Sequence, residues 1–314
     1  MYYIGIDLGG TGIKAGIVDE SGAILHKDSC PTGVERGYEA IVADMAALAK
    51  RVVEESGHTL AEIKAVGIGL PGVIDPATHR VPFCTNLGWH DVPIIEEMHK
   101  HIDLPVYVDN DATVAGLAEA VAGVSAGLDT SVFVTLGTGV GGGIIINGKP
   151  FSGAHGVASE IGHMITVAGG ELCTCGNRGC WERYASATAL IREGRKLAAE
   201  KPTCALAKAV DGDLQQIGAK HIIDLAKAND PDCVALFDWY VNHLCIGLVN
   251  LINLYDPEVI ALGGGVSHAG QFLLDAVNAK LSQYIFYKTM PHSRIELAKT
   301  GNDAGIIGAA MLGR

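Results

Sequence analysis

Residues 2–25, YYIGIDLGGTGIKAGIVDESGAIL, contain two apolar runs on either side of a glycine-rich turn, and DESG then makes a second turn. Apolar runs bounded by Gly, Asp and Ser predict strand, turn, strand, turn, strand. Residues 130–150, TSVFVTLGTGVGGGIIINGKP, repeat the first part of this scheme. This weak internal repeat predicts two similarly built halves.

The rest of the chain alternates helical and strand patterns. Residues 38–57 and 302–314 have the spacing of helices, residues 63–75 read as a buried strand followed by a loop, and residues 104–123 read as a strand and then a helix. Further helices are expected from Ser186, over 232–255 and over 269–284. We therefore expect an α/β protein with an N-terminal lobe, 1–109, completed by the helix at 300–314, and a larger lobe, 110–299.

Composition narrows the class of protein. The 314 residues are 48% hydrophobic, carry a net charge of −12 and have a pI of about 5.4. This acidic balance argues against nucleic-acid and anionic-membrane partners, which require basic surfaces. The start of the chain lacks the pattern of a signal peptide, and no apolar run approaches the ~20 residues of a membrane-spanning helix. We expect a cytoplasmic protein.

Three glycine-rich turns follow strands: DLGGTGIK, TLGTGVGGG and ALGGGVS. Glycine lets backbone amides approach a phosphate closely, so three such turns favour phosphate binding. The G-x-G-x-x-G matches at 137–142 and 67–72 are not dinucleotide fingerprints, because no helix follows at the required place. Asp7 could meet a phosphate only through Mg²⁺, whereas Thr11 and Lys14 could contact it directly.

Two groups of polar residues suit phosphoryl transfer to an alcohol. VDNDAT places Asp109, Asn110 and Asp111 where a strand meets a helix, and such a carboxylate can accept the hydroxyl proton. An Asn-Asp pair also suits vicinal sugar hydroxyls, although an N-cap is the simpler role for any one of the three. Glu160, His163 and Glu182 are further candidates for binding a polyol.

The stretch EIGHMITVAGGELCTCGNRGCWE, residues 160–182, contains three cysteines and one histidine. In a reducing compartment, clustered cysteines favour a metal over disulfides. The stretch is either a metal knuckle that only staples a loop or part of a reaction site.

These motifs together resemble the ROK family of sugar kinases, which belongs to the actin–hexokinase–Hsp70 superfamily. The resemblance covers essentially the whole chain and rests on DLGGT (7–11), LGTGVGGG (136–143), EIGH (160–163) and CTCGNRGCWE (173–182). It implies a two-lobed, actin/hexokinase-like (ribonuclease H-like) ATPase fold with a cleft between the lobes. Ser159 departs from the family, because many members have Gly there.

The resemblance also implies site residues. The family's catalytic base corresponds to Asp111, and its sugar-binding set to Asn110, Asp111, Glu160, His163 and Glu182. Its ATP-binding turns correspond to Gly5, Asp7, Gly9, Gly10, Thr11, Lys14, Gly137, Thr138, Gly139, Gly141, Gly264 and Gly265. Its zinc ligands correspond to His163, Cys173, Cys175 and Cys180.

The spacing His-x₉-Cys-x-Cys-x₄-Cys supplies the four ligands of a closed structural zinc site. If one ring nitrogen of His163 binds zinc, the other can face the sugar, so the metal would aim this side chain. We expect loss of zinc to weaken glucose binding and to leave ATP binding nearly unchanged, because the ATP turns lie far away in the sequence.

The resulting expectation is an ATP-dependent hexose kinase that uses Mg²⁺ and carries structural Zn²⁺, most simply a glucokinase. Kinases of N-acetylmannosamine, N-acetylglucosamine, fructose or allose are alternatives within the family. A non-catalytic sugar sensor on the same fold is the alternative from another class. Family likeness further suggests a homodimer or a larger homo-oligomer.

Overall fold

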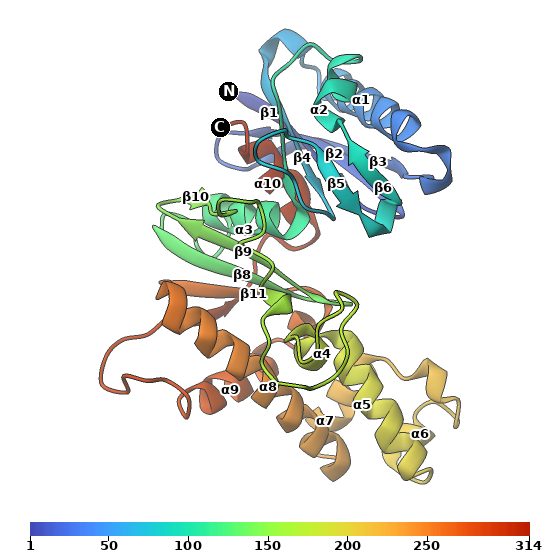
Figure 1. The fold of residues 1–314 in the computed structure, drawn as a ribbon, viewed down its shortest axis with the longest axis vertical. Helices are drawn as coiled ribbons and strands as arrows, with labels where there is room; N and C mark the ends of the chain where they lie inside the picture. The colour runs from blue at the N-terminus through green and yellow to red at the C-terminus, as the bar shows by residue number, and fades with distance from the viewer. The chain divides into compact units, whose positions relative to one another are not determined.

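The computed structural model describes residues 1–314 and shows an α/β chain (Figure 1). Its contacts divide it into two compact units. Unit 1 comprises residues 1–133, 143–159 and 298–314, and unit 2 comprises 134–142 and 160–297. Unit 1 therefore includes residues 110–133 and 143–159, which the sequence-based boundary assigned to the larger lobe. The division into lobes at Asp109 stays a prediction.

A five-stranded sheet forms the centre of unit 1. Its order is β3 (Ile24–Pro31), β2 (Gly12–Asp19), β1 (Tyr2–Leu8), β4 (Ile63–Leu70) and β7 (Val106–Asn110). Strands β1, β2 and β3 form consecutive antiparallel pairs, whereas β4 runs parallel to β1 and to β7. The predicted succession of strands and turns over residues 2–25 is confirmed.

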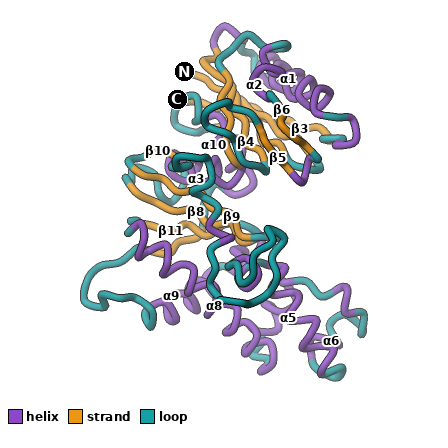
Figure 2. Tube along the Cα trace, viewed as in Figure 1, coloured by secondary structure: helices purple, strands orange, loops and turns teal.

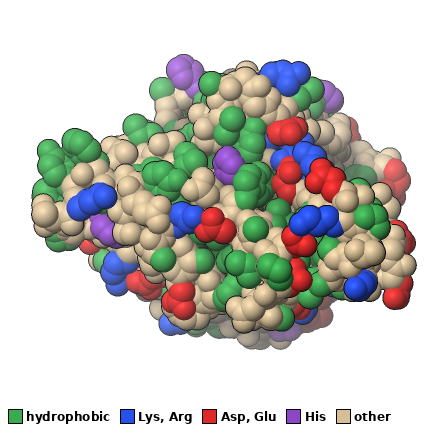
Figure 3. All heavy atoms as spheres, turned by 90° about the horizontal axis from the view of Figure 1, so that it is seen from below, with side chains coloured by type: hydrophobic (Ala, Val, Ile, Leu, Met, Phe, Trp, Pro, Cys, Tyr) green, Lys and Arg blue, Asp and Glu red, His purple; other side chains and the backbone are tan.

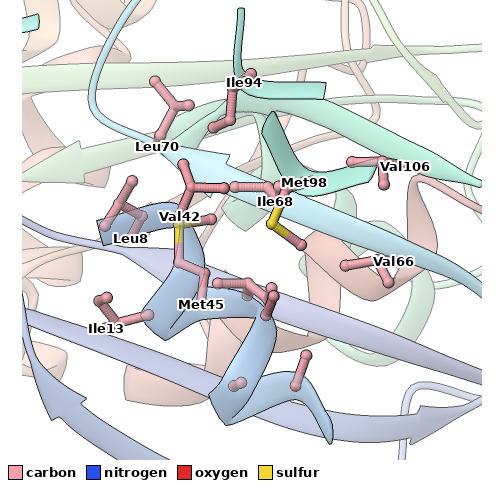
Figure 4. Packing of buried hydrophobic residues seen from close by; sticks show 14 of the residues in the cluster. Leu8, Ile13, Val42, Met45, Val66, Ile68, Leu70, Ile94, Met98 and Val106 are labelled. Atoms are coloured by element: carbon pink, nitrogen blue, oxygen red, sulfur yellow. The ribbon is translucent and has the colours of Figure 1, made fainter. Parts of the chain in front are cut away.

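Helices cover both faces of this sheet. Helix α1 (Tyr38–Glu55) and helix α2 (Ile94–His99) pack on one face, where Ile4, Ile6 and Leu8 join them in the core. Figure 4 shows Leu8 and Ile13 of the hairpin near Val42 and Met45 of α1. Side chains alternate along a strand, so the intervening residues of β1 point to the other face. That face is covered by helix α10 (Ala304–Met311).

Two glycines let α10 lie directly on the strands. A Cβ atom at Gly5 would stand 1.9 Å from the carbonyl oxygen of Ile306, and one at Gly67 would stand 1.7 Å from that of Ala309. No side chain fits at such distances, so both positions require glycine for packing. Helix α3 (Asp111–Ala122) lies against α10, and the short ribbon of β5 (Val81–Cys84) and β6 (Trp89–Val92) completes unit 1.

The second five-stranded sheet carries the other two glycine turns. Its order is β10 (Lys149–Pro150), β9 (Val140–Ile146), β8 (Thr130–Leu136), β11 (Val259–Gly263) and β12 (Arg294–Leu297). One turn lies between β8 and β9, and the other follows β11. The helices of unit 2 are α4 (Glu182–Ala185), α5 (Ala187–Glu200), α6 (Ala205–Lys208), α7 (Ala219–Lys227), α8 (Pro231–Tyr255) and α9 (Gln271–Leu281). Figure 2 shows that most helices of the chain lie among these elements.

Helix α8 is an exception to the expectation that no segment is long and apolar enough to cross a membrane. Its 25 residues include a window with a mean hydropathy of 1.3, of which 61% is buried inside the protein. Helices α5, α7 and α9 pack against it. Core helices of globular domains have the same length and composition, because their neighbours cover several of their faces.

Several charged side chains of unit 2 form ion pairs. Lys196 lies 3.1 Å from Glu193, and Lys280 lies 2.6 Å from Asp238. On the face drawn in Figure 3, basic and acidic side chains are interspersed with apolar ones. This face offers no broad positive field of the kind that a nucleic-acid backbone requires.

Candidate active site

The first predicted glycine turn lies between β1 and β2. The Gly9 amide donates to the Gly12 carbonyl at 2.9 Å and closes the turn. Gly9 and Gly10 are half-buried and Thr11 is exposed. A Cβ atom at Gly10 would stand 3.3 Å from the carbonyl oxygen of Asn86, so the segment after β5 lies close to this turn.

Asp7 lies at the base of the same turn. Its carboxylate is 3.5 Å from the Lys14 ammonium, and the two side chains are 24% and 47% exposed. Helix α10 passes directly over this carboxylate, since a Cβ atom at Gly305 would stand 2.5 Å from Asp7 Cγ. This contact with residue 305 could not be predicted from sequence spacing, because 298 positions separate the two residues in the chain.

The junction of β7 and α3 presents the predicted carboxylates of unit 1. The Asn110 side chain caps α3, because its Oδ1 accepts from the amides of Ala112 at 2.9 Å and Thr113 at 3.3 Å. Its amide nitrogen donates to Gly72 O at 3.2 Å, so one N–H of Asn110 is left for another partner. Asp111 is exposed at the first position of the helix.

Asp109 has a different environment from Asp111. Burial raises the pKa of the Asp109 carboxyl, and Ser152 Oγ lies within 3.4 Å of it. Asp109 is half-buried and hydrogen-bonded, whereas Asp111 is exposed and accepts from the Ala112 amide at 2.8 Å. The structure thus gives Asp109 and Asp111 different environments, although they lie two residues apart in the sequence.

The second glycine turn, Gly137 to Gly141 at the start of β9, belongs to unit 2. The Gly137 amide donates to Gly139 O at 3.1 Å, and the Ala187 amide donates to Gly137 O at 2.8 Å. Thr138 is exposed at the tip. A Cβ atom at Gly139 would stand 2.7 Å from Glu182 Oε2, so this predicted sugar-binding carboxylate adjoins the turn.

The third glycine turn follows β11. Gly264 has a φ of 81°, and a Cβ atom there would stand 2.6 Å from the Leu136 amide. Glycine is therefore required by both backbone conformation and space. Gly265 has no atom within 4 Å of such a Cβ position, so its surroundings are open.

The cysteine-rich stretch brings its four predicted ligands together. One ligand atom each from His163, Cys173, Cys175 and Cys180 lies within 4.8 Å of the others. The Cys173 sulfur is 3.7 Å from His163 Nδ1, and the sulfurs of Cys175 and Cys180 are 3.6 Å apart. A tetrahedron with Zn–S bonds of ~2.3 Å has edges of about 3.8 Å, so these residues fit zinc.

The two nitrogens of His163 face different neighbours. Nδ1 lies on the side of Cys173, whereas Nε2 is 3.9 Å from Glu160 Oε2. A metal held at Nδ1 would leave Nε2 directed toward Glu160; the predicted contact of this nitrogen with a sugar stays a prediction. Burial also raises the pKa of the Cys180 thiol to about 12, so a cation is needed to hold this residue as a thiolate.

Trp181 anchors this cluster on the core of unit 2. Its side chain is fully buried, and its indole N–H donates to His243 O at 2.9 Å. A Cβ atom at Gly247 would stand 1.9 Å from the indole ring, so the ring lies flat on α8 where this glycine leaves space. Trp181 was not among the predicted site residues, although it lies between a predicted metal ligand, Cys180, and a predicted sugar-binding residue, Glu182.

Glu182 connects the cysteine cluster with the second glycine turn. Its Oε1 accepts from the Cys173 thiol at 3.1 Å, while its Oε2 lies against Gly139. Unit 2 therefore brings together the predicted metal ligands, Glu160, Glu182 and two glycine turns. Unit 1 holds the first turn, Asp7, Lys14, Asn110 and Asp111, together with Gly5, whose place beneath α10 accounts for its missing side chain.

Comparison with known proteins gives a consistent result. A glucokinase from Streptomyces coelicolor is 39% identical over 316 residues, covering 99% of this chain and 97% of that protein. A ROK family glucokinase from Streptomyces griseus, solved with glucose and AMPPNP, is 38% identical with a TM-score of 0.82, covering 99% of each chain. The ROK hexokinase of Thermus thermophilus is 32% identical with a TM-score of 0.85 and covers 99% of this chain and 97% of its own. Residues 3–314 match the ROK family itself. The protein belongs to the ROK family and has its two-lobed, actin/hexokinase-like fold.

Proposed function

We propose that this protein transfers the γ-phosphoryl group of ATP to a hexose, with glucose as substrate and glucose 6-phosphate as product. The observation that carries the proposal is near-complete alignment with glucokinases at 36–39% identity. The solved relative from Streptomyces griseus was obtained with both glucose and an ATP analogue. The residues described above supply the chemistry that this reaction needs.

Asp111 is the proposed general base. It is exposed, and it lies at the N-terminus of a 12-residue helix, α3. The helix dipole stabilises the ionised carboxylate, which is the form that accepts the proton from the sugar 6-hydroxyl. Asn110 is partly committed to capping α3, so we assign it one remaining N–H for a sugar hydroxyl.

Glu160, His163 and Glu182 are the proposed sugar-binding groups of unit 2. Glu160 and Glu182 accept hydrogen bonds from hydroxyls, and His163, with Nδ1 on zinc, would donate through its Nε2–H. Zinc held by His163 and the three cysteines would fix the tautomer of this ring and supply structural stability. Because the ligand set is closed, the chemistry of the reaction remains with Asp111 and ATP.

The glycine turns are the proposed ATP site. The turns at Gly9–Gly12 and Gly137–Gly141 offer backbone amides to the phosphates, and Thr11 and Lys14 add a hydroxyl and an ammonium. Asp7 is an anion, so it would serve ATP through Mg²⁺, which neutralises phosphate charge when bound. Gly264 and Gly265 are proposed to lie near the adenosine.

A coupled assay of ADP release decides between enzyme and sugar sensor. We expect ADP only when ATP, Mg²⁺ and a hexose are all present. The presence of Asp111 and of complete glycine turns favours catalysis over a non-catalytic sugar sensor. If the purified protein binds glucose but releases no ADP with any hexose, the sensor alternative replaces the kinase.

The identity of the sugar is decided by a panel of glucose, mannose, fructose, allose, N-acetylglucosamine and N-acetylmannosamine, compared by kcat/KM. We expect glucose to have the highest value. The same protein should behave as a homodimer or larger oligomer in light scattering, and we expect it to act in the cytoplasm, where ATP and glucose meet.

A further inference from the structure

Thr32 holds the first glycine turn from behind. The residue follows β3 and is completely buried. Its hydroxyl donates to the Gly9 carbonyl at 2.6 Å, and its amide donates to the Thr11 carbonyl at 3.2 Å. One buried residue therefore contacts both sides of the turn that we propose as an ATP phosphate site.

The chemistry of these two contacts suits an anion site. Both acceptors are carbonyl oxygens, which would repel a phosphate if they turned toward it. Tying the Gly9 carbonyl back to Thr32 points the Gly10 N–H of the same peptide group the opposite way, and neither Gly10 nor Thr11 donates a backbone hydrogen bond. A turn rich in glycine samples many conformations, so these amides converge only if another element restrains them.

Arg36 extends this restraint to helix α1. Its guanidinium Nη2 donates to the Thr32 carbonyl at 2.8 Å and to Asp44 Oδ2 at 2.5 Å. Asp44 belongs to α1, which is packed into the core of unit 1. A continuous path therefore runs from a rigid helix through Arg36 and Thr32 to the turn.

We propose that Thr32 is a positioning residue for the nucleotide, acting by holding the Gly9–Thr11 turn in its phosphate-binding conformation, with Arg36 as its outer support. The inference rests on the proposed kinase function for the identity of the ligand. It predicts an effect selective for ATP, because the hydrogen bonds of Thr32 go to the first glycine turn and to Arg36.

The test compares Thr32→Val with Thr32→Ser. Valine keeps the shape of threonine but cannot donate to Gly9, and a hydrogen bond contributes about 1 kcal/mol, so the KM for ATP should rise about fivefold to tenfold. The Kd for AMPPNP, measured by calorimetry without turnover, should rise by a similar factor. The KM for glucose should stay unchanged, and Thr32→Ser should restore most of the nucleotide affinity.

Thr300→Val is the matched control. The Thr300 hydroxyl donates to Glu119 at 2.5 Å in the same unit and makes no contact with the turn. Its loss should lower the melting temperature and leave the KM for ATP as in the wild type. If Thr32→Val behaves like Thr300→Val, or raises the KM values of both substrates equally, Thr32 is a structural residue and the proposal is wrong.

Arg36→Ala provides a second variant that does not empty the core. The Arg36 side chain is 41% exposed and lines a cavity of about 390 Å³ with Cys30 and Arg51. We expect a smaller rise in the KM for ATP, about twofold to threefold, because only the support of Thr32 is lost. An unchanged KM would remove Arg36 from the proposed path.

The two proposals fail in different ways. If the wild type turns over glucose but Thr32→Val binds AMPPNP normally, the positioning role is wrong and the kinase stands. If the wild type binds AMPPNP but phosphorylates no hexose, the kinase proposal is wrong, and weaker AMPPNP binding by Thr32→Val still supports the role of Thr32.

Discussion

At the scale of single residues, the most direct test concerns Asp111. We expect Asp111→Asn to lower kcat by about 10²–10⁴-fold, because the amide keeps the shape of the side chain but cannot accept the sugar proton. Glucose should still bind measurably in calorimetry. The exposed Asp103→Asn serves as a control and should keep full activity. Near wild-type turnover by Asp111→Asn would assign the base to another group.

The sugar-binding side chains lead to a second prediction at this scale. Glu160, His163 and Glu182 are expected to pair with hydroxyls at the C1–C2 edge of glucose. An acetamido group at C2 would remove the hydroxyl that these side chains are expected to bind, so kcat/KM for N-acetylglucosamine should be far below that for glucose. Equal values for the two sugars would contradict the choice of glucose and leave the kinase class intact.

At the scale of elements, the position of Glu182 changes the expected effect of zinc. The sequence placed the ATP turns far from the cysteines, which predicted that only glucose binding depends on the metal. In the structure, Glu182 touches Cys173 on one side and Gly139 on the other. If the cysteine-rich stretch becomes disordered, Glu182 can therefore shift and disturb the second glycine turn.

We accordingly expect Cys175→Ser to lose zinc and to weaken both ligands, glucose more strongly than ATP. A serine hydroxyl replaces a thiolate poorly, and metal-binding energy is also folding energy. Metal analysis and separate titrations of glucose and AMPPNP into the folded variant measure the two effects. Cys204→Ser, outside the cluster, is the control. If the zinc-free variant binds both ligands like the wild type, the cysteine cluster has a structural role only and supports neither ligand site.

The close approach of α10 to Asp7 gives a second element-scale prediction. In Gly305→Ala, the new methyl group would overlap the Asp7 carboxylate, so the carboxylate must move. We expect a higher Mg²⁺ requirement and a lower kcat. In an Asp7→Ala background the carboxylate is gone and the residue 7 Cβ, 2.9 Å from the new methyl position, is still there, so the cost of Gly305→Ala in unfolding free energy should be smaller in a double-mutant cycle. Additive costs would show that the two residues do not interact.

At the scale of the whole molecule, Glu119 ties the returning C-terminal segment to unit 1. This fully buried carboxylate accepts from the amides of Lys299 at 2.8 Å and Thr300 at 2.7 Å, and from Val124 at 2.9 Å. We expect Glu119→Gln to lower the unfolding free energy by about 2–4 kcal/mol in urea titrations, because an amide nitrogen would then face backbone donors. Glu55→Gln, at an exposed ion pair with His26, should cost less than about 1 kcal/mol. Equal costs would contradict the anchoring role.

Much of the fold and of the candidate site followed from local patterns in the sequence. Apolar runs and glycine turns predicted the hairpin of residues 2–25, because side-chain alternation and turn conformation depend on near neighbours. The spacing of His163 and the three cysteines predicted a four-ligand cluster, and the structure brings the four ligand atoms together. The family motifs predicted the glycine turns and Asp111 as site residues, because each motif is a short stretch of neighbouring residues.

Only the tertiary structure shows which residues in and around the candidate site also make contacts that hold the fold together. Gly5 makes room for α10, Asn110 caps α3, Thr32 ties back the first turn, and Glu182 joins Cys173 to Gly139. The contacts of Gly5, of Thr32 and of Glu182 with Gly139 join positions distant in the chain, where sequence spacing carries no information on distance. Strand register and helix packing bring those positions together, and they arise from the burial of the whole core rather than from any one segment.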